Sequence, residues 1–158
     1  MDAVLFQWSE SFSIGLQEVD EQHKVLVGLL NELHEAIIHH HGSKAARDVL
    51  NRLTEYTRTH FTVEESLMRI LNYPEFPQHK QMHEDLLHQV IDLQLKLDSG
   101  QAAITFELLH FLKVWLTKHI NESDKRFGAF AVAKGLAPAW SPQVAQSMAK
   151  KKWRWKFW

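Results

Sequence analysis

Two short stretches of the sequence are the most informative about the fold, His60-Phe61-Thr62-Val63-Glu64-Glu65 and His79-Lys80-Gln81-Met82-His83. In each stretch two side chains that can bind a metal stand four residues apart, His60 with Glu64 and His79 with His83. Residues four apart in an α-helix lie on the same face, one turn above each other. Imidazole and carboxylate together suit a metal such as iron or zinc. The two pairs therefore predict a metal site between successive helices.

Apolar residues around these stretches recur at alternating steps of three and four, the spacing of helices packed in a bundle. The pattern divides into four segments, separated by Gly42-Ser43, by the proline-containing run 72–77 and by Asp98-Ser99-Gly100. Such short connections predict an all-α protein, an up-down-up-down antiparallel four-helix bundle with a non-helical N-terminal arm over residues 1–17. The residues predicted to face inward are Val19, His23, Leu26, Leu30, Leu33 and Ile37; Val49, Leu53, Tyr56, His60, Glu64, Leu67 and Leu71; His79, His83, Leu86, Val90, Leu93 and Leu97; and Ile104, Leu108, Phe111, Trp115 and His119.

Each of the four predicted helices carries at least one histidine on its inward face. In an antiparallel bundle the starts of the first and third helices meet the ends of the second and fourth. His23 and His79 near helix starts are therefore expected beside His60 and His119 near helix ends. A single inward histidine is usually a satisfied core residue, but five at one level with a carboxylate are costly to bury without a metal.

The runs that carry these histidines resemble the hemerythrin family in its bacterial single-domain form. They are Val19-Asp20-Glu21-Gln22-His23, the two stretches quoted first, and Trp115-Leu116-Thr117-Lys118-His119-Ile120-Asn121-Glu122-Ser123-Asp124. The resemblance covers about residues 6–127 and includes every ligand run in order. It implies a non-haem centre of two iron ions bridged by oxygen, within a domain that we place at residues 1–130.

The resemblance also implies which residues bind the iron ions. His79, His83 and His119 would hold one iron, His23 and His60 the other, and Glu64 and Asp124 would bridge both. Spacing alone favours Glu122 over Asp124, because five residues on a regular helix turn the side chain by about 140°. Gln22 and Glu65 are candidate hydrogen-bond partners of the ligand imidazoles. By the same resemblance Trp115 and Leu116 lie beside an open position on the second iron, with Phe61 and Ile120 as expected neighbours; ordinary core packing is the alternative for these four.

Reversible binding of dioxygen, for transport, storage or delivery, is the function that the resemblance implies. Carboxylate-rich di-iron enzymes use a pair of Glu-x-x-His motifs, and no such pair occurs in this sequence. Five neutral imidazoles with two carboxylates supply less negative charge to stabilise highly oxidised iron, and no acid, base or nucleophile is set aside for a second substrate. We therefore expect a binding protein and no enzyme. The alternatives are a sensor of oxygen, redox state or iron, and a di-iron oxidase, peroxidase or scavenger of nitric oxide. A zinc site is disfavoured, since seven ligands exceed the four of structural zinc.

Composition is that of a globular protein of 158 residues, with enough length for one domain and its core. The chain has no cysteine, which excludes disulfides and cysteine-bound iron–sulfur clusters. It also lacks a signal-like N-terminus and an apolar run of membrane-spanning length, so we expect a cytoplasmic protein, with dioxygen as its ligand and a monomeric state.

Charge is distributed unevenly along the chain. All 19 acidic residues lie at or before Asp124, whereas residues 125–158 carry eight basic residues and no acidic one. We assign 131–158 to a C-terminal extension, whose cationic, Trp-rich tail is typical of segments at an anionic membrane surface. The tail is expected to dock on such a membrane, peripheral to the inner membrane, or on a membrane-bound oxygen-using enzyme, and nucleic acid is not the expected partner. Its residues are Lys150, Lys151, Lys152, Trp153, Arg154, Trp155, Lys156, Phe157 and Trp158.

Overall fold

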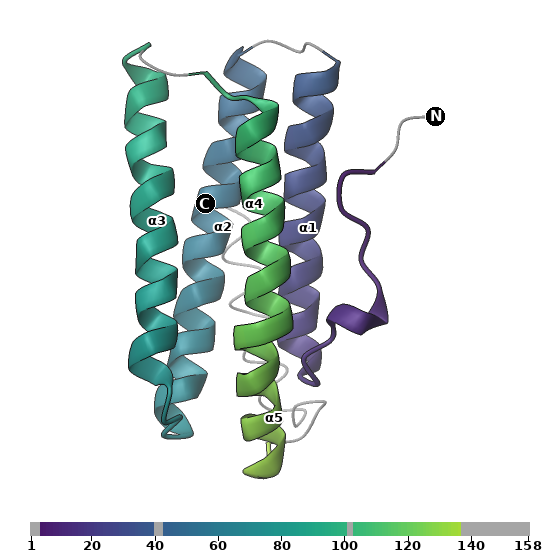
Figure 1. The fold of residues 1–158 in the computed structure, drawn as a ribbon, viewed down its shortest axis with the longest axis vertical. Coiled ribbons are helices and arrows are strands. Elements are labelled where there is room, and N and C mark those ends of the chain that lie inside the picture. The colour runs from purple at the N-terminus through teal and green to yellow at the C-terminus, as the bar shows by residue number, and fades with distance from the viewer. Residues whose placement is uncertain (1–3, 40–42, 101–102, 137–158) are drawn as a thin grey trace.

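Four long helices stand side by side in the computed structural model, which describes residues 4–39, 43–100 and 103–136 (Figure 1). They are α1 (Gln17–Ile38), α2 (Ser43–Ile70), α3 (Phe76–Asp98) and α4 (Phe106–Lys118). The chain reverses direction after each of the first three, and α4 continues through the π-helical segment η2 (His119–Asp124) into α5 (Lys125–Ala133). The all-α class is confirmed, and the four helices fit the predicted antiparallel bundle.

Local sequence signals set the helix boundaries. Asn72 adopts a positive φ of 54° after α2, a conformation that ends helices and that asparagine tolerates. Pro77 lies in the first turn of α3, where its missing N–H removes no helical hydrogen bond. Gly100 follows α3 with φ of 77°, and the Thr105 side chain caps α4 by accepting a hydrogen bond from the Leu108 N–H at 3.3 Å. These boundaries fix which turns of the four helices lie at the same level.

Two apolar clusters divide the interior. The larger includes Leu26, Leu30 and Leu86 and fills most of the bundle. The smaller includes Val19 and Met68, together with Leu16, Tyr73, Ile120, Phe127 and Ala131, and lies at the end where α2 joins α3. Val19 and Leu26 stand about one turn before and one turn after His23, so a polar layer is enclosed between the clusters.

One inward-facing residue was predicted wrongly. Phe111 is 38% exposed, whereas Leu109 and Leu112 are buried on the inner face of α4. Inward-facing residues recur every three or four positions, so the inward residue between Leu108 and Trp115 can be either Phe111 or Leu112. Periodicity alone does not distinguish them. The packing of α4 selects Leu112 and leaves Phe111 beside the groove between α3 and α4.

The N-terminal arm packs along the bundle and contains one short 3₁₀ turn, η1 (Glu10–Phe12). Phe6 is buried in the larger cluster, and its N–H and C=O both bond the Asn31 side chain, at 2.9 and 2.7 Å. Farther along the arm, Ile14 lies so close to Gly128 of α5 that its carbonyl would collide with any Cβ there. The arm therefore closes the end of the bundle that contains the polar layer.

None of the helices within the described residues is both long and apolar enough to cross a membrane. The predicted tail, residues 150–158, and most of the predicted extension lie outside those residues.

Candidate metal centre

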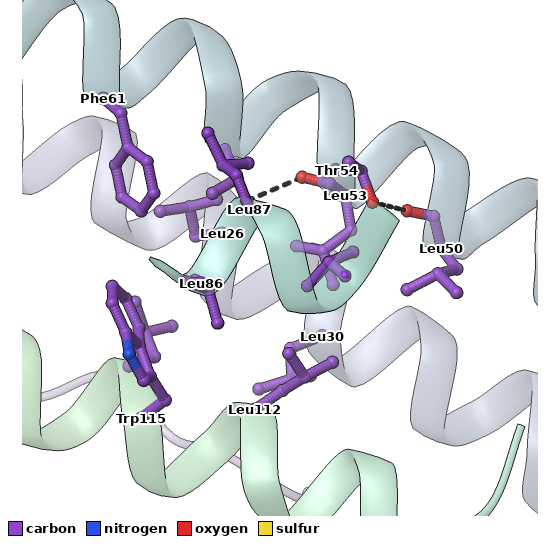
Figure 2. Close-up of a pocket in the computed structure, with 13 residues that line it drawn as sticks. Leu26, Leu30, Leu50, Leu53, Thr54, Phe61, Leu86, Leu87, Leu112 and Trp115 are labelled. Carbon is purple, nitrogen blue, oxygen red and sulfur yellow. Dashed lines mark hydrogen bonds between the residues drawn. The ribbon is translucent and has the colours of Figure 1, made fainter. Parts of the chain in front are cut away.

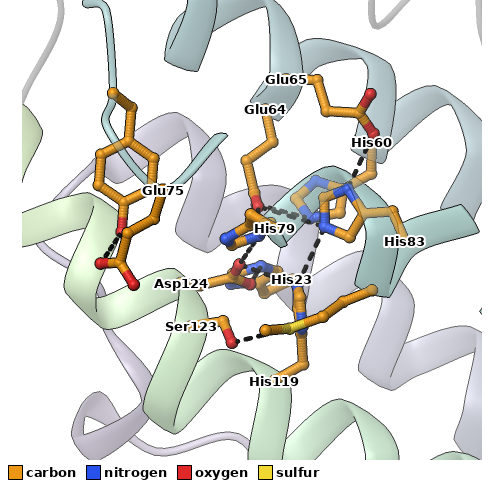
Figure 3. Close-up of polar contacts among 12 residues, drawn as sticks. His23, His60, Glu64, Glu65, Glu75, His79, His83, His119, Ser123 and Asp124 are labelled. Atoms are coloured by element: carbon orange, nitrogen blue, oxygen red, sulfur yellow. Dashed lines mark hydrogen bonds and ion pairs between the residues drawn. The ribbon is translucent and has the colours of Figure 1, made fainter. Parts of the chain in front are cut away.

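All seven predicted ligand residues converge at one end of the bundle (Figure 3). They come from the N-terminal parts of α1 and α3, the second half of α2, and η2. All seven are buried, and both carboxylate residues are completely so. The residues are His23, His60, Glu64, His79, His83, His119 and Asp124.

Asp124 lies among three imidazoles. Its Oδ2 is 3.0 Å from Nε2 of His23, and its Oδ1 is 3.0 Å from Nε2 of His79 and 3.1 Å from Nε2 of His119. The two oxygens therefore face different histidines, which is the arrangement that a bridging carboxylate needs.

Glu64 occupies the corresponding place on the other side of the layer. Its Oε1 is 2.6 Å from Nε2 of His79 and 3.5 Å from Nε2 of His83, whereas its Oε2 is 3.3 Å from Nε2 of His60. Like Asp124, Glu64 divides its oxygens between two sets of imidazoles.

Two groups of candidate ligand atoms result, each with all its atoms within 4.8 Å of one another. The first consists of Glu64, His79, His83, His119 and Asp124; the second consists of His23, His60, Glu64 and Asp124. Both carboxylates belong to both groups, so the geometry provides two neighbouring metal positions, one with three imidazoles and one with two.

The lack of hydrogen-bond partners for the buried donor atoms also supports a pair of metal ions. All four carboxylate oxygens of Glu64 and Asp124 are buried without a well-formed hydrogen bond, and so is Nε2 of both His23 and His79. Buried polar atoms are almost always paired, because leaving them unpaired is costly. These atoms lie within the two groups of closely spaced donors, and cations bound among them would satisfy their lone pairs.

The π-helical segment explains why Asp124 reaches the site. Five residues after His119, its side chain would point away from His119 on a regular α-helix. In η2 the i→i+5 pattern widens the turn and brings both residues to the same side. Glu122, the residue that spacing favoured, is exposed. Such π segments are rare and occur frequently at functional sites.

Two residues outside the ligand set, Gln22 and Glu65, orient ligand imidazoles by hydrogen bonds. His60 Nδ1 lies 2.7 Å from Gln22 Oε1, and His83 Nδ1 lies 2.9 Å from Glu65 Oε2. Because amide and carboxylate oxygens accept, Nδ1 carries the proton in both rings and Nε2 keeps its lone pair for a metal. Both candidate partners predicted from the sequence are thus in contact with a predicted ligand.

Without a metal, the carboxylates hold protons on part of this cluster. Burial alone would lower the pKa of His79, but Asp124 and Glu64 outweigh it and raise the pKa to about 9. Burial likewise opposes charge on His83, yet Glu64 and Glu65 raise its pKa. For His60 burial prevails and lowers the pKa.

The two carboxyl groups respond in the opposite direction. Burial would raise both pKa values, and repulsion from Asp124 would also raise the pKa of Glu64. The close imidazoles of His60, His79 and His83 nevertheless hold the pKa of Glu64 below its ordinary value, and the imidazole of His119 acts similarly on Asp124. Both carboxylates are therefore ionised at neutral pH and ready to bind cations.

Aromatic rings cover two of the ligand imidazoles. Phe61 stacks on His83 with centroids 3.7 Å apart and planes inclined by 2°, and Trp115 stacks on His119 at 4.4 Å and 14°. Each ring shields one face of a ligand imidazole from water. Both rings come from residues that the sequence predicted for an oxygen pocket.

An apolar cavity of about 50 Å³ extends from these two rings into the bundle (Figure 2). Phe61, Trp115 and Leu116 line it, but Ile120 does not, because Ile120 packs in the smaller cluster. Sequence reasoning did not assign the other lining residues, although the spacing from the ligands could have indicated some of them: Leu26 and Leu86 each follow a ligand histidine by three residues. The remaining lining residues are Leu30, Leu50, Leu53, Thr54, Thr57, Leu87, Val90 and Leu112.

A helical bundle that encloses two metal positions among imidazoles and shared carboxylates defines the class of non-haem dinuclear metalloproteins. Comparison with known proteins identifies one family within this class. Residues 14–131 match the family described as Hemerythrin HHE cation binding domain. A bacteriohemerythrin of Stenotrophomonas maltophilia is 32% identical over 123 residues, which cover 78% of this chain and 79% of that relative. A bacteriohemerythrin of Methylococcus capsulatus is 31% identical over 125 residues, covering 78% of this chain and 95% of that relative.

A solved structure, the crystal structure of wild-type hemerythrin, superimposes with a TM-score of 0.76 at 30% identity, covering 79% of this chain and 96% of that one. The chain belongs to the hemerythrin family. The di-iron cofactor predicted from the resemblance is confirmed at the level of the family and of the clustered donor residues, and with it the capacity to bind oxygen.

Proposed function

We propose that this chain is a reversible dioxygen-binding protein that serves transport, storage or delivery of oxygen. The observation that carries the proposal is the unequal pair of donor groups, which share Glu64 and Asp124 and contain three and two imidazoles. Family membership supports iron as the metal.

Each ligand has a distinct role in the proposal. His79, His83 and His119 would hold one iron. His23 and His60 would hold the second, which has one imidazole fewer and could therefore bind dioxygen. Glu64 and Asp124 would be shared by both irons. The neutral imidazoles outnumber the carboxylates, which limits the negative charge available to stabilise highly oxidised iron.

Iron held by these residues would supply the reversible two-electron chemistry that binding of dioxygen requires. The chain's contribution is to keep water away from that chemistry. Phe61 and Trp115 shield the imidazoles of His83 and His119, and the cavity beyond them is lined almost wholly by apolar side chains. Its two hydroxyls are already occupied: Thr54 donates to the Leu50 carbonyl at 2.8 Å, and Thr57 to the carbonyl of Leu53 at 2.7 Å. A cavity without free polar groups stays dry and accepts small apolar molecules, which supports its assignment as the oxygen pocket.

The experiment that tests this function is anaerobic reconstitution with ferrous iron, followed by optical spectra through cycles of oxygen and argon. A charge-transfer band that appears under oxygen and fades under argon, over repeated cycles, is the expected result. A band that forms once and never reverses would refute reversible binding. Steady consumption of oxygen with an added reductant would favour the enzyme alternative.

Delivery of the oxygen to a membrane-bound enzyme is the finer part of the proposal, and it rests on the composition of residues 150–158. Five cations and four aromatic residues in that segment favour attraction to an anionic bilayer. The test compares the full chain with a chain lacking residues 148–158 for partition onto vesicles of phosphatidylserine and phosphatidylcholine. Loss of binding on truncation is expected; equal partition of the two chains would remove the membrane from the proposal. Sedimentation of the same samples would test the expected monomeric state.

A further inference from the structure

A groove on the surface between α3 and α4 reaches the metal centre from outside. His119 and Trp115 lie in its lining, together with Met82 of α3 and Ser123 of η2. Among the seven candidate ligand residues His119 is the most exposed, at 5%, so the groove is where solvent comes closest to a ligand imidazole. Met82 is 37% exposed in the same groove.

The Met82 thioether is held next to the centre. Ser123 donates a hydrogen bond from Oγ to the Met82 sulfur at 3.3 Å. Ser123 directly precedes the candidate ligand Asp124, and both residues are labelled in Figure 3. The sulfur is therefore fixed at the outer edge of the site. The other methionine among the described residues, Met68, is 0% exposed within the smaller apolar cluster.

We propose that Met82 is an oxidation site that intercepts hydrogen peroxide leaving the metal centre through this groove. The inference rests on the proposed function, because the peroxide arises from failed oxygen carriage. Autoxidation of two ferrous ions by one dioxygen consumes two protons and releases one hydrogen peroxide. The Met82 sulfur then attacks one peroxide oxygen: the O–O bond breaks, an S–O bond forms, and the remaining oxygen leaves as water. Sulfur is oxidised by two electrons and the peroxide is reduced by two, giving methionine sulfoxide, which cellular reductases can reverse.

Consumption of peroxide at Met82 lowers the amount that can react with the aromatic residue in the same groove, Trp115. Trp115 lines the same groove and stacks on His119, so peroxide in the groove can reach the indole ring as well as the Met82 sulfur. Replacement of Met82 by leucine keeps the volume and apolar character of the side chain but removes the sulfur. The Met82→Leu variant is therefore expected to carry more oxidised Trp115 after autoxidation than the parent chain does.

The experiment uses a matched methionine on the same helix. Leu95 of α3 is 64% exposed and lies 13 residues from Met82, about 20 Å along the helix and away from the metal centre. The Leu95→Met chain, loaded with ferrous iron, is allowed to autoxidise in air with catalase in solution, which destroys peroxide that has escaped into the bulk. The same chain without metal is treated with added hydrogen peroxide and no catalase. Peptide mass spectrometry then measures sulfoxide at Met82 and at the introduced methionine.

The measured quantity is the ratio of sulfoxide at Met82 to sulfoxide at the introduced methionine, and we expect this ratio to be high after autoxidation and low after added peroxide. Autoxidation should oxidise Met82 in preference to the introduced methionine, whereas added peroxide should oxidise the more exposed introduced methionine at least as fast. Equal ratios in both conditions, or an unmodified Met82 after complete autoxidation, would overturn the proposal. Unchanged Trp115 oxidation in Met82→Leu would also count against it. The optical spectra recorded in parallel separate this outcome from failure of the proposed function, which would appear as absence of a reversible oxygen band while Met82 still reports on the peroxide released.

Discussion

Metal binding at this centre should release protons well above the pH at which an ordinary histidine has lost its charge. In the metal-free protein the carboxylates of Glu64 and Asp124 raise the pKa of His79 to about 9. At pH 8 a group with that pKa is about nine-tenths protonated, whereas a histidine with an unperturbed pKa of about 6.5 is about 3% protonated. A metal binds only the neutral imidazole, so binding must displace the proton. His83, whose pKa is also raised, should add to the release.

The magnitude follows from the difference between pKa and pH. At pH 7 the His79 proton weakens apparent metal affinity by about 100-fold, which is about 2.7 kcal/mol, and the penalty shrinks tenfold for each pH unit up to about 9. The assay is anaerobic titration of ferrous iron into weakly buffered metal-free protein with a pH indicator, at pH 7 and pH 8, against a blank without protein. We expect about one proton or more per chain at both pH values. Release of less than about 0.3 proton at pH 8 would refute the electrostatic coupling on which this prediction depends.

The same shift makes a prediction for the stability of the metal-free fold. A raised pKa contributes stability that is fully present below the unfolded value of about 6.5 and is lost as pH rises through about 9. The pKa values of Glu64 and Asp124 are lowered, so both groups stay ionised across this window and their contribution does not change. The thermal midpoint of the metal-free protein should therefore fall between pH 7 and pH 9.5. A constant or rising midpoint would contradict it.

Three further predictions concern the parts that support the centre. Glu65→Ala removes the acceptor of the His83 Nδ1 proton and should weaken iron retention against a ferrous chelator by about 10- to 100-fold. The control, Glu84→Ala on the exposed side of α3, should leave retention unchanged. Equal retention in both variants would contradict a role for Glu65. Gly128→Ala should lower the thermal midpoint by displacing the arm at Ile14, and an unchanged midpoint would show that the close packing there carries no energy. Removal of iron by a chelator should also lower the thermal midpoint, because a metal that binds only the folded chain stabilises the folded state. The same midpoint with and without iron would exclude a link between iron binding and stability.

Periodicity predicted most of the bundle because the ligands and the core share one spacing. His60 with Glu64 and His79 with His83 could be placed from the sequence alone, since each pair lies on one turn of a regular helix. Phe111 was misplaced for the same reason, because the steps of three and four that predict an inward face allow either Phe111 or Leu112.

Helical periodicity did not predict that Asp124 is a ligand. The π-helical turn of η2 departs from regular helical spacing, and the sequence pattern does not predict it. Only the family resemblance identified Asp124, whereas spacing favoured Glu122. The hydrogen bond from Ser123 to Met82 joins residues 41 positions apart, and the sequence offered no signal for it. The tail remains a prediction from composition.

The most direct test of a di-iron centre bridged by Glu64 and Asp124 is an iron count on two matched variants. Asp124→Asn removes one bridging carboxylate at the end of η2, and Glu122→Gln makes the same kind of change at an exposed residue on the same turn. After anaerobic reconstitution and gel filtration, the parent chain and Glu122→Gln should each retain two irons, and Asp124→Asn should retain fewer than two. Two irons in Asp124→Asn, or a loss confined to Glu122→Gln, would contradict the assignment of the bridge and with it the proposed centre.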